Sequence, residues 1–218
     1  MNLKSFISLA ISLGLTLSCT GCSNTPKSTA KNNNNSSVSF TTKENKDDST
    51  KETYPKPDWE TQIYKGKYLK YEIPKNWSKN EAHSIEEMNL DFFTPTDTTS
   101  EMPSNINIQI SSLQSNSKNI DYSDEKIKED FHKFLLSSGQ LPEEAQSGKY
   151  FTEEINGIWV YYLTFVRKIQ DDLSAKQTIY LPMGLDYSII IWATDFNDGS
   201  TPKVDDIAKY ICATLEIV

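Results

Sequence analysis

The sequence predicts an α+β domain, an α/β/α sandwich around a mostly antiparallel sheet, preceded by a secretion signal and a polar linker. Short runs of alternating apolar residues, separated by turn residues, indicate antiparallel strands. Two runs, 159–165 and 188–193, are bulky on both alternating sides, which is typical of strands covered on both faces. Segments with helical spacing after Ser123 and after Pro202 are available as the cover.

The first 22 residues have the layout of a bacterial lipoprotein signal. Lys4 is followed by a mainly apolar stretch, 6–17, and then by small residues with two cysteines. The stretch is shorter than the about 20 apolar residues needed to span a bilayer. We expect residues 1–21 to be removed and Cys22 to carry a diacylglycerol, so that the chain is extracytoplasmic and lipid-anchored to the bacterial cell membrane. Cys19 is the alternative site of the lipid, because lipoprotein signals usually have a leucine three positions before the lipidated cysteine and neither cysteine has one.

Residues 22–57 are predicted to be a flexible polar linker. They are rich in Ser, Thr, Asn, Lys and Glu and contain almost no apolar residues, so they cannot bury enough surface to fold. Residues 58–218 have the length of one domain. The chain has a net charge of −8, which argues against a nucleic-acid partner. Of the three cysteines only Cys212 lies in this domain, and we expect it to be a buried apolar residue without a disulfide.

The first half of the domain is predicted to hold strands and then a helix. Alternation indicates strands at 64–73, 90–94 and 105–111, the first of them ended by Pro74. A helix opens at Ser123, because apolar residues then recur at helical spacing, and Gly139 is placed to end it.

Two hairpins and a last helix are predicted for the second half. Asn156-Gly157 between 149–155 and 158–169 is the strongest short hairpin signal. Strands at 176–181 and 186–194 follow, and Thr201-Pro202 offers a cap and a first-turn proline for the final helix.

The segment from Tyr68 to Trp77, YLKYEIPKNW, resembles the opening of PsbP-like domains. That family includes the photosystem II extrinsic subunit, proteins that bind the Ran GTPase, and bacterial lipoproteins. The resemblance covers about residues 64–218 and implies a PsbP-like fold with a role in binding or assembly. It brings no catalytic residues. From the residues themselves, Pro74 is interpreted as a strand terminator and Trp77 as a core anchor.

The sequence contains no recognised catalytic or metal-binding motif, so we expect no enzyme activity, cofactor or metal. Its two histidines, His83 and His132, lie far apart and lack further ligands at zinc-site spacing. The acidic segment 195–200, together with Asp206, partly matches a calcium loop. Its glycine is one place early and Asp206 replaces the usual glutamate, so a polar turn is the preferred interpretation.

Four aromatic residues on the predicted strands are the candidate ligand groove: Tyr161, Tyr180, Tyr187 and Trp192. Filling the core is the commoner task of such residues and stays the alternative. The sequence therefore predicts a membrane-anchored lipoprotein with a non-catalytic binding domain, whose partner is a small molecule or an envelope protein. An accessory subunit of an envelope complex is the second hypothesis, and an uncharacterised hydrolase is the third.

Overall fold

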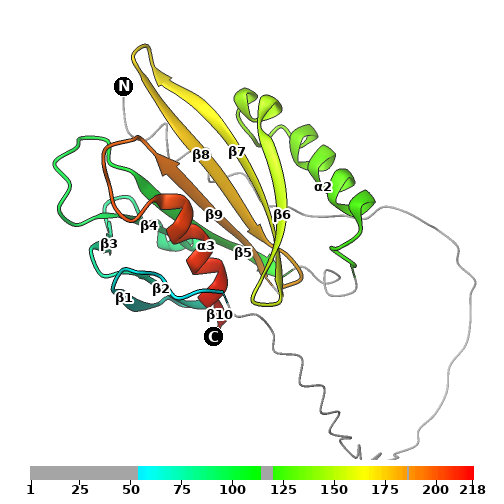
Figure 1. The fold of residues 1–218 in the computed structure, drawn as a ribbon, viewed down its shortest axis with the longest axis horizontal. Helices are drawn as coiled ribbons and strands as arrows, with labels where there is room; N and C mark the ends of the chain where they lie inside the picture. The colour runs from blue at the N-terminus through cyan, green and yellow to red at the C-terminus, as the bar shows by residue number, and fades with distance from the viewer. Residues whose placement is uncertain (1–53, 114–119, 186) are drawn as a thin grey trace, which may run out of the picture.

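The computed structural model describes residues 54–113, 120–185 and 187–218 (Figure 1). Cys19, Cys22 and nearly all of the predicted linker lie outside the described residues, as does Asp186. No helix in the described part is long and apolar enough to cross a bilayer.

The main sheet has seven strands in the order β3-β4-β5-β9-β8-β7-β6, and all neighbouring strands pair antiparallel. The predicted antiparallel sheet is therefore confirmed, with strand ends shifted by up to three residues. In spatial order the strands are β3 (Trp77–Lys79), β4 (Leu90–Pro95), β5 (Asn105–Leu113), β9 (Tyr187–Asp195), β8 (Leu173–Pro182), β7 (Ile158–Gln170) and β6 (Lys149–Ile155).

A second, three-stranded sheet corrects the prediction of one strand at 64–73. It contains β1 (Thr61–Lys65), β2 (Leu69–Pro74) and β10 (Glu216–Ile217), with β2 in the centre. The chain reverses at Gly66, whose amide donates to the Leu69 carbonyl at 2.8 Å. Glycine is a turn residue, and it overrides the alternating pattern on either side.

The helices lie where the helical spacing placed them, but their caps differ from the prediction. Helix α2 (Glu125–Ser137) is capped by Asp124, whose carboxylate accepts from the amides of Lys126 and Ile127, and not by Ser123. Gly139, with φ of 68°, follows its end as expected. Helix α3 (Val204–Thr214) begins after Lys203, which makes no side-chain cap, so Thr201-Pro202 lies before the helix instead of capping it. Two 3₁₀ turns, η1 (Glu86–Met88) and η3 (Glu143–Ser147), complete the described elements.

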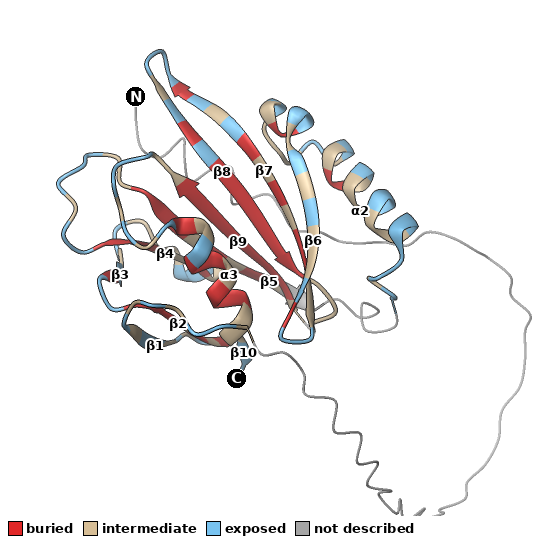
Figure 2. Cartoon of the chain, viewed as in Figure 1, coloured by how far each residue is buried: buried red, intermediate tan, exposed pale blue. Residues whose placement is uncertain are grey.

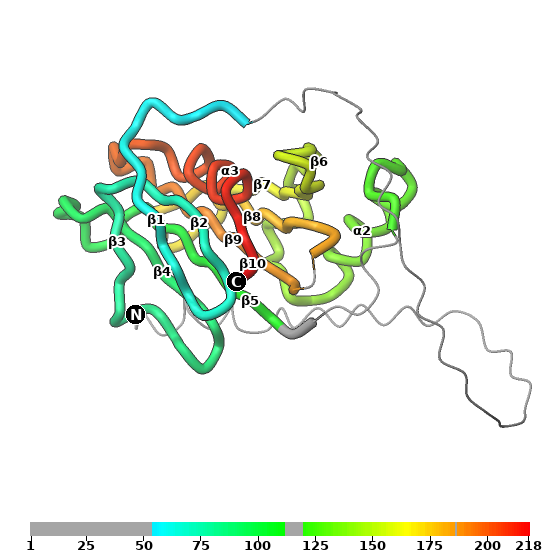
Figure 3. Tube along the Cα trace, turned by 90° about the horizontal axis from the view of Figure 1, so that it is seen from below, coloured from blue at the N-terminus to red at the C-terminus, as the bar shows by residue number. Residues whose placement is uncertain are grey.

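The two helices pack on opposite faces of the main sheet, which confirms the sandwich. Helix α3 and the small sheet cover one face, over a core that includes Trp77, Ile108 and Ile191 (Figures 1 and 3). Helix α2 packs on the other face against a second core containing Tyr161 and Leu163. The predicted core role of Trp77 is confirmed, since it is 1% exposed.

Strands β8 and β9 are buried along most of their length (Figure 2). For the run 188–193 this confirms the interpretation that bulky residues on both alternating sides mark a covered strand. The run 159–165 is covered only in part, because residues 159, 162 and 164 of β7 are half-buried. Helix α2, however, lies at the β6 end of the sheet (Figure 1). The part of the same face over β4, β5 and β9 therefore has no described helix above it.

Candidate ligand pocket

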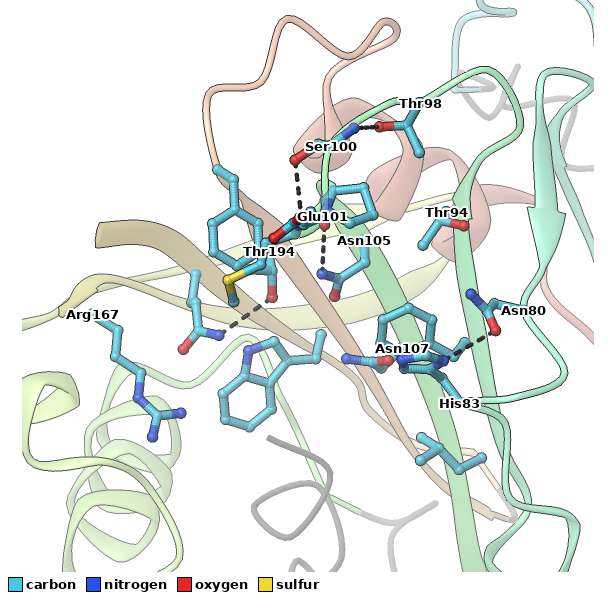
Figure 4. A pocket seen from close by; sticks show the side chains of 17 residues that line it. Asn80, His83, Thr94, Thr98, Ser100, Glu101, Asn105, Asn107, Arg167 and Thr194 are labelled. Carbon is cyan, nitrogen blue, oxygen red and sulfur yellow. Dashed lines mark hydrogen bonds between the residues drawn. The ribbon is translucent and has the colours of Figure 1, made fainter. Parts of the chain in front are cut away.

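A pocket of about 340 Å³ lies on that helix-free part of the sheet (Figure 4). Strands β4, β5, β9 and β8 contribute its floor, and the loops after β3 and β4 contribute its rim. Its volume is at the lower end of the range of small-molecule sites, about 300–1,000 Å³. The strands that form the floor also hold the core, so the site rests on the rigid part of the domain.

The period of two along each strand puts polar residues on this face. In β5 the isoleucines Ile106, Ile108 and Ile110 point into the α3-side core, so Asn105 and Asn107 point the other way, into the pocket. In β9 the same alternation sends Ile191 to the core and Trp192 to the pocket. The face of the sheet toward α3 is therefore apolar, and the face that lines the pocket is a mixture of polar and aromatic residues.

Strand pairing joins these residues into two rows across the floor. In one row Phe92 pairs with Asn107, and Asn107 pairs with Trp192. Directly opposed side chains on one face of antiparallel strands lie about 4.5–5.5 Å apart at Cβ, so this row alternates aromatic, amide and aromatic groups in contact range.

The second row is polar throughout. Asn105 pairs with Thr194, and Thr194 pairs with Gln177. Gln177 donates from Nε2 to Thr194 Oγ1 at 3.3 Å, and Asn105 donates from Nδ2 to the Pro103 carbonyl at 3.0 Å. Gln177 and Asn105 are only 4% and 9% exposed, which is unusual for amides in a small domain.

Three polar atoms of the floor are buried without a hydrogen-bond partner among the described residues. They are the side-chain oxygens of Asn107 and Gln177 and the indole nitrogen of Trp192. A buried polar group left without a partner costs about 1–3 kcal/mol, so native structures contain few of them. Of the eight such atoms in the described part of the chain, these three belong to residues that line one pocket, where a bound ligand supplies the missing partners.

The rim is held in place by polar contacts. Asn80 Oδ1 lies 3.1 Å from His83 Nδ1, and the His83 ring packs on Phe92 with 5.2 Å between ring centroids (Figure 4). Next to the lining residues Pro103 and Asn105, the carboxylate of Asp198 accepts from the Ser104 amide at 2.8 Å and from its hydroxyl at 2.9 Å.

The contacts of Asp198 account for the acidic segment 195–200. Burial acts to raise the pKa of Asp198, but hydrogen bonds from Ser200 and Ser104 outweigh it and lower that pKa. Asp195 accepts from the amide of Asn197. The carboxylates thus hold the turn and the adjoining loop, in line with the preferred interpretation of a polar turn. Among the described residues, no three His, Cys, Asp or Glu side chains are grouped to hold a metal ion.

The four aromatic residues of the predicted groove do not face one common groove. Trp192 lines the pocket, whereas Tyr161, on the same face, packs under α2 and its hydroxyl lies 2.6 Å from His132 Nδ1. Tyr180 and Tyr187 lie on the α3 face. Tyr180 donates to Asp205 at 2.9 Å, and Tyr187 packs against a neighbouring tyrosine. Tyr187 and Trp192 lie five positions apart on β9, so the period of two places them on opposite faces of the sheet. The register that pairs Trp192 with Ile179 leaves the adjacent Tyr180 on the other face.

The pocket amides were missed in the sequence, although a signal was present. Asn105, Asn107 and Gln109 alternate with three isoleucines, so one face of that strand is polar while the other is core.

Cys212 fits its prediction as a buried residue, because it is 0% exposed and burial raises the pKa of its thiol. Burial also lowers the pKa of His132.

Comparisons with known proteins give similarity in fold only. No family model matches the chain, and no curated protein matches it. Solved structures that resemble it include the cyanobacterial PsbP (CyanoP) of Synechocystis, at 12% identity and a TM-score of 0.43, covering 72% of this chain and 92% of that one. The Ran-binding protein Mog1p of Saccharomyces cerevisiae has 9% identity and a TM-score of 0.49, with 73% and 96% covered.

A Bacteroides thetaiotaomicron protein has 12% identity and a TM-score of 0.48, with 73% of this chain and 48% of that one covered. PsbP and a Ran-binding protein are two of the three kinds of protein that the sequence resemblance named. Likeness of this degree says nothing about ligand, partner or activity.

Proposed function

We propose that this chain is a lipid-anchored extracytoplasmic protein whose folded domain binds a small uncharged ligand in the pocket on the main sheet. The observation that supports the proposal is the group of buried polar atoms without partners, on Asn107, Gln177 and Trp192. A bound ligand that hydrogen-bonds to them removes the penalty of their burial. Each atom is covered in the free protein, but the last torsions of Asn and Gln are soft, so the amides turn toward a ligand at low cost.

The proposed role is binding and not catalysis. The pocket residues that could act as acid or base are His83 and Glu101, and the contacts of His83 are with Asn80 and Phe92, not with a nucleophile. Nucleophilic catalysis needs a nucleophile and a base within hydrogen-bonding reach. The lining is otherwise amide, hydroxyl and apolar, which suits recognition. The same pocket favours a small ligand over the alternative role as an accessory subunit of an envelope complex.

The membrane anchor is a separate part of the proposal, supported by the sequence. Cys22, or Cys19 in the alternative, carries the lipid, and residues up to 57 connect it to the domain.

A thermal-unfolding panel on the purified protein tests the binding site. Uncharged sugars, capped amino acids and nucleosides are compared with charged analogues. A ligand at one hundred times its dissociation constant adds about 2.7 kcal/mol, or roughly 5–10 °C for a domain of this size. We expect at least one uncharged compound to give such a rise, and Asn107→Leu to abolish it. Tyr187→Phe, on the opposite face, is the matched control and keeps it.

Two outcomes contradict the pocket assignment. Stabilisation that survives Asn107→Leu and disappears in Tyr187→Phe would move the site to the α3 face. A flat panel would remove the small-ligand role and favour the accessory subunit.

Intact mass of the protein extracted from bacterial membranes tests the anchor. We expect a chain that begins at Cys22 and carries a diacylglycerol, and Cys22→Ser should release the protein from the membrane fraction. Cys19→Ser is the control that keeps it there. If only Cys19→Ser releases the protein, the lipid is on Cys19. A mature chain with no lipid on either cysteine contradicts the anchor.

A further inference from the structure

The unfilled hydrogen-bonding groups of the pocket define which ligands satisfy it. Asn107 and Gln177 each have a carbonyl oxygen that lacks a donor, and this oxygen becomes accessible to a ligand when the amide turns. A carboxylate or phosphate offers acceptors only, and an ammonium group offers donors only. A hydroxyl both donates and accepts. A hydroxyl can therefore still hydrogen-bond to an amide that has flipped and exchanged its oxygen for its NH₂ group.

The apolar part of the pocket alternates with this polar part. Phe92 and Trp192 flank Asn107 in one row, and Phe196 also lines the pocket. Aromatic rings give a large contact area at a low entropy cost, and Trp adds a polar group at its edge. A ligand that fits both parts has an apolar face of C–H groups and hydroxyls around its edge.

The charges at the pocket do not favour an ion. Its charged lining residues are Glu101, which is exposed, and Arg167, which already has an interaction in the structure. Phosphate and carboxylate sites use Arg in paired, two-pronged hydrogen bonds, often several together. The one anionic and the one cationic side chain of the lining balance, and the floor itself carries no charged residue, so the pocket suits a neutral ligand.

From these observations we infer that the pocket binds a neutral saccharide, a mono- or disaccharide unit that places one C–H face on the Trp192 and Phe92 rings and its hydroxyls on Asn107 and Gln177. This inference rests on the proposed binding function and names its ligand class. A pocket of about 340 Å³ has room for a ligand of this size. A peptide is disfavoured, because its recognition commonly uses a sheet edge or a long groove, whereas this pocket lies on the face of the sheet.

The indole N–H signals of the protein report directly on this site by NMR. The four tryptophans give one such signal each, and Trp192→Phe identifies the one in the pocket. Methyl glucoside, N-acetylglucosamine, cellobiose and chitobiose are the neutral probes, glucuronate is the charged one, and N-acetylalaninamide represents a peptide. Trp159→Phe removes a tryptophan that lies outside the pocket and carries Lys128 at 5.0 Å from its ring.

We expect a neutral saccharide to shift the Trp192 signal in a saturable manner and to leave the Trp159 signal in place. Gln177→Met should weaken that binding about tenfold, which corresponds to one lost hydrogen bond of average to strong type. Trp159→Phe should leave the affinity within about twofold, since surface changes distant from a site add independently.

Each contrary result has its own meaning. Glucuronate that binds as tightly as its neutral counterpart overturns the neutral class. If saccharides leave the Trp192 signal unmoved while N-acetylalaninamide or another uncharged compound shifts it, the saccharide inference falls and the binding function stands. If no compound of the thermal panel binds either, both the inference and the proposed small-ligand function fall.

Discussion

Gln177→Met is expected to stabilise the free protein, although it replaces a hydrogen-bonding side chain. Gln177 is 4% exposed, its Oε1 has no partner among the described residues, and its Nε2 makes only a long contact of 3.3 Å with Thr194. Methionine has a similar length and is unbranched, so it fills the same space without a buried carbonyl.

The expected magnitude follows from two opposing contributions. Removing a buried oxygen without a partner relieves about 1–3 kcal/mol. Losing the long contact to Thr194 costs about 0.5–1 kcal/mol, at the lower end for hydrogen bonds between neutral groups. With both contributions at the middle of their ranges, the net gain is about 1 kcal/mol, which raises the melting temperature of a domain of this size by roughly 2–4 °C.

Urea unfolding followed by circular dichroism measures the change, with Thr178→Val as the matched control. Thr178 neighbours Gln177 on the opposite face, is 1% exposed, and has its hydroxyl 3.0 Å from that of Thr164. Because this hydroxyl is satisfied, Thr178→Val should destabilise by about 0.5–1.5 kcal/mol. If Gln177→Met also destabilises by about 1 kcal/mol or more, its oxygen has a partner in the free protein and the reasoning about the pocket floor is refuted.

Three further predictions concern the scaffold. Burial acts to raise the pKa of Asp205, but hydrogen bonds from three neighbours lower it, so stability should fall as pH drops below about 5, and Asp205→Asn should flatten that slope in urea titrations. Asn156→Ala should lower the free energy of unfolding by about 1–3 kcal/mol, because alanine is strained at the φ of 49° and cannot make the two side-chain hydrogen bonds of Asn156. An unchanged midpoint in chemical denaturation contradicts this. With Cys19 and Cys22 replaced by serine, Cys212 should resist thiol reagents until denaturant unfolds the chain.

Local pattern was sufficient for much of the fold. The Asn156-Gly157 hairpin has both residues at positive φ, 49° and 82°, as the dipeptide indicates. Helix caps were less predictable, since Ser123 and Asp124 are adjacent and both are good caps. Which of them caps the helix depends on where the chain turns, and Ser123 is already bound to Asp121.

The candidate site was predictable only in its parts. Trp192 was named from the sequence, but it was grouped with Tyr180 and Tyr187, which lie on the other face of the sheet. Its actual neighbours, Asn107 and Phe92, come from strands much earlier in the chain. No spacing rule links residues so far apart, because the link is made by strand order.

By itself the sequence determined both helices, most strands of the main sheet and the apolar side of β5, and its first 22 residues have the layout that predicts a lipid anchor. These properties are local, since the period of a helix or strand and the chemistry of a turn are set by neighbouring residues. The tertiary structure decided that β5 lies beside β9 and that α2 covers only the β6 end of the sheet. Those choices depend on the packing of distant surfaces against one another, and they alone turn scattered amides and aromatic rings into one pocket.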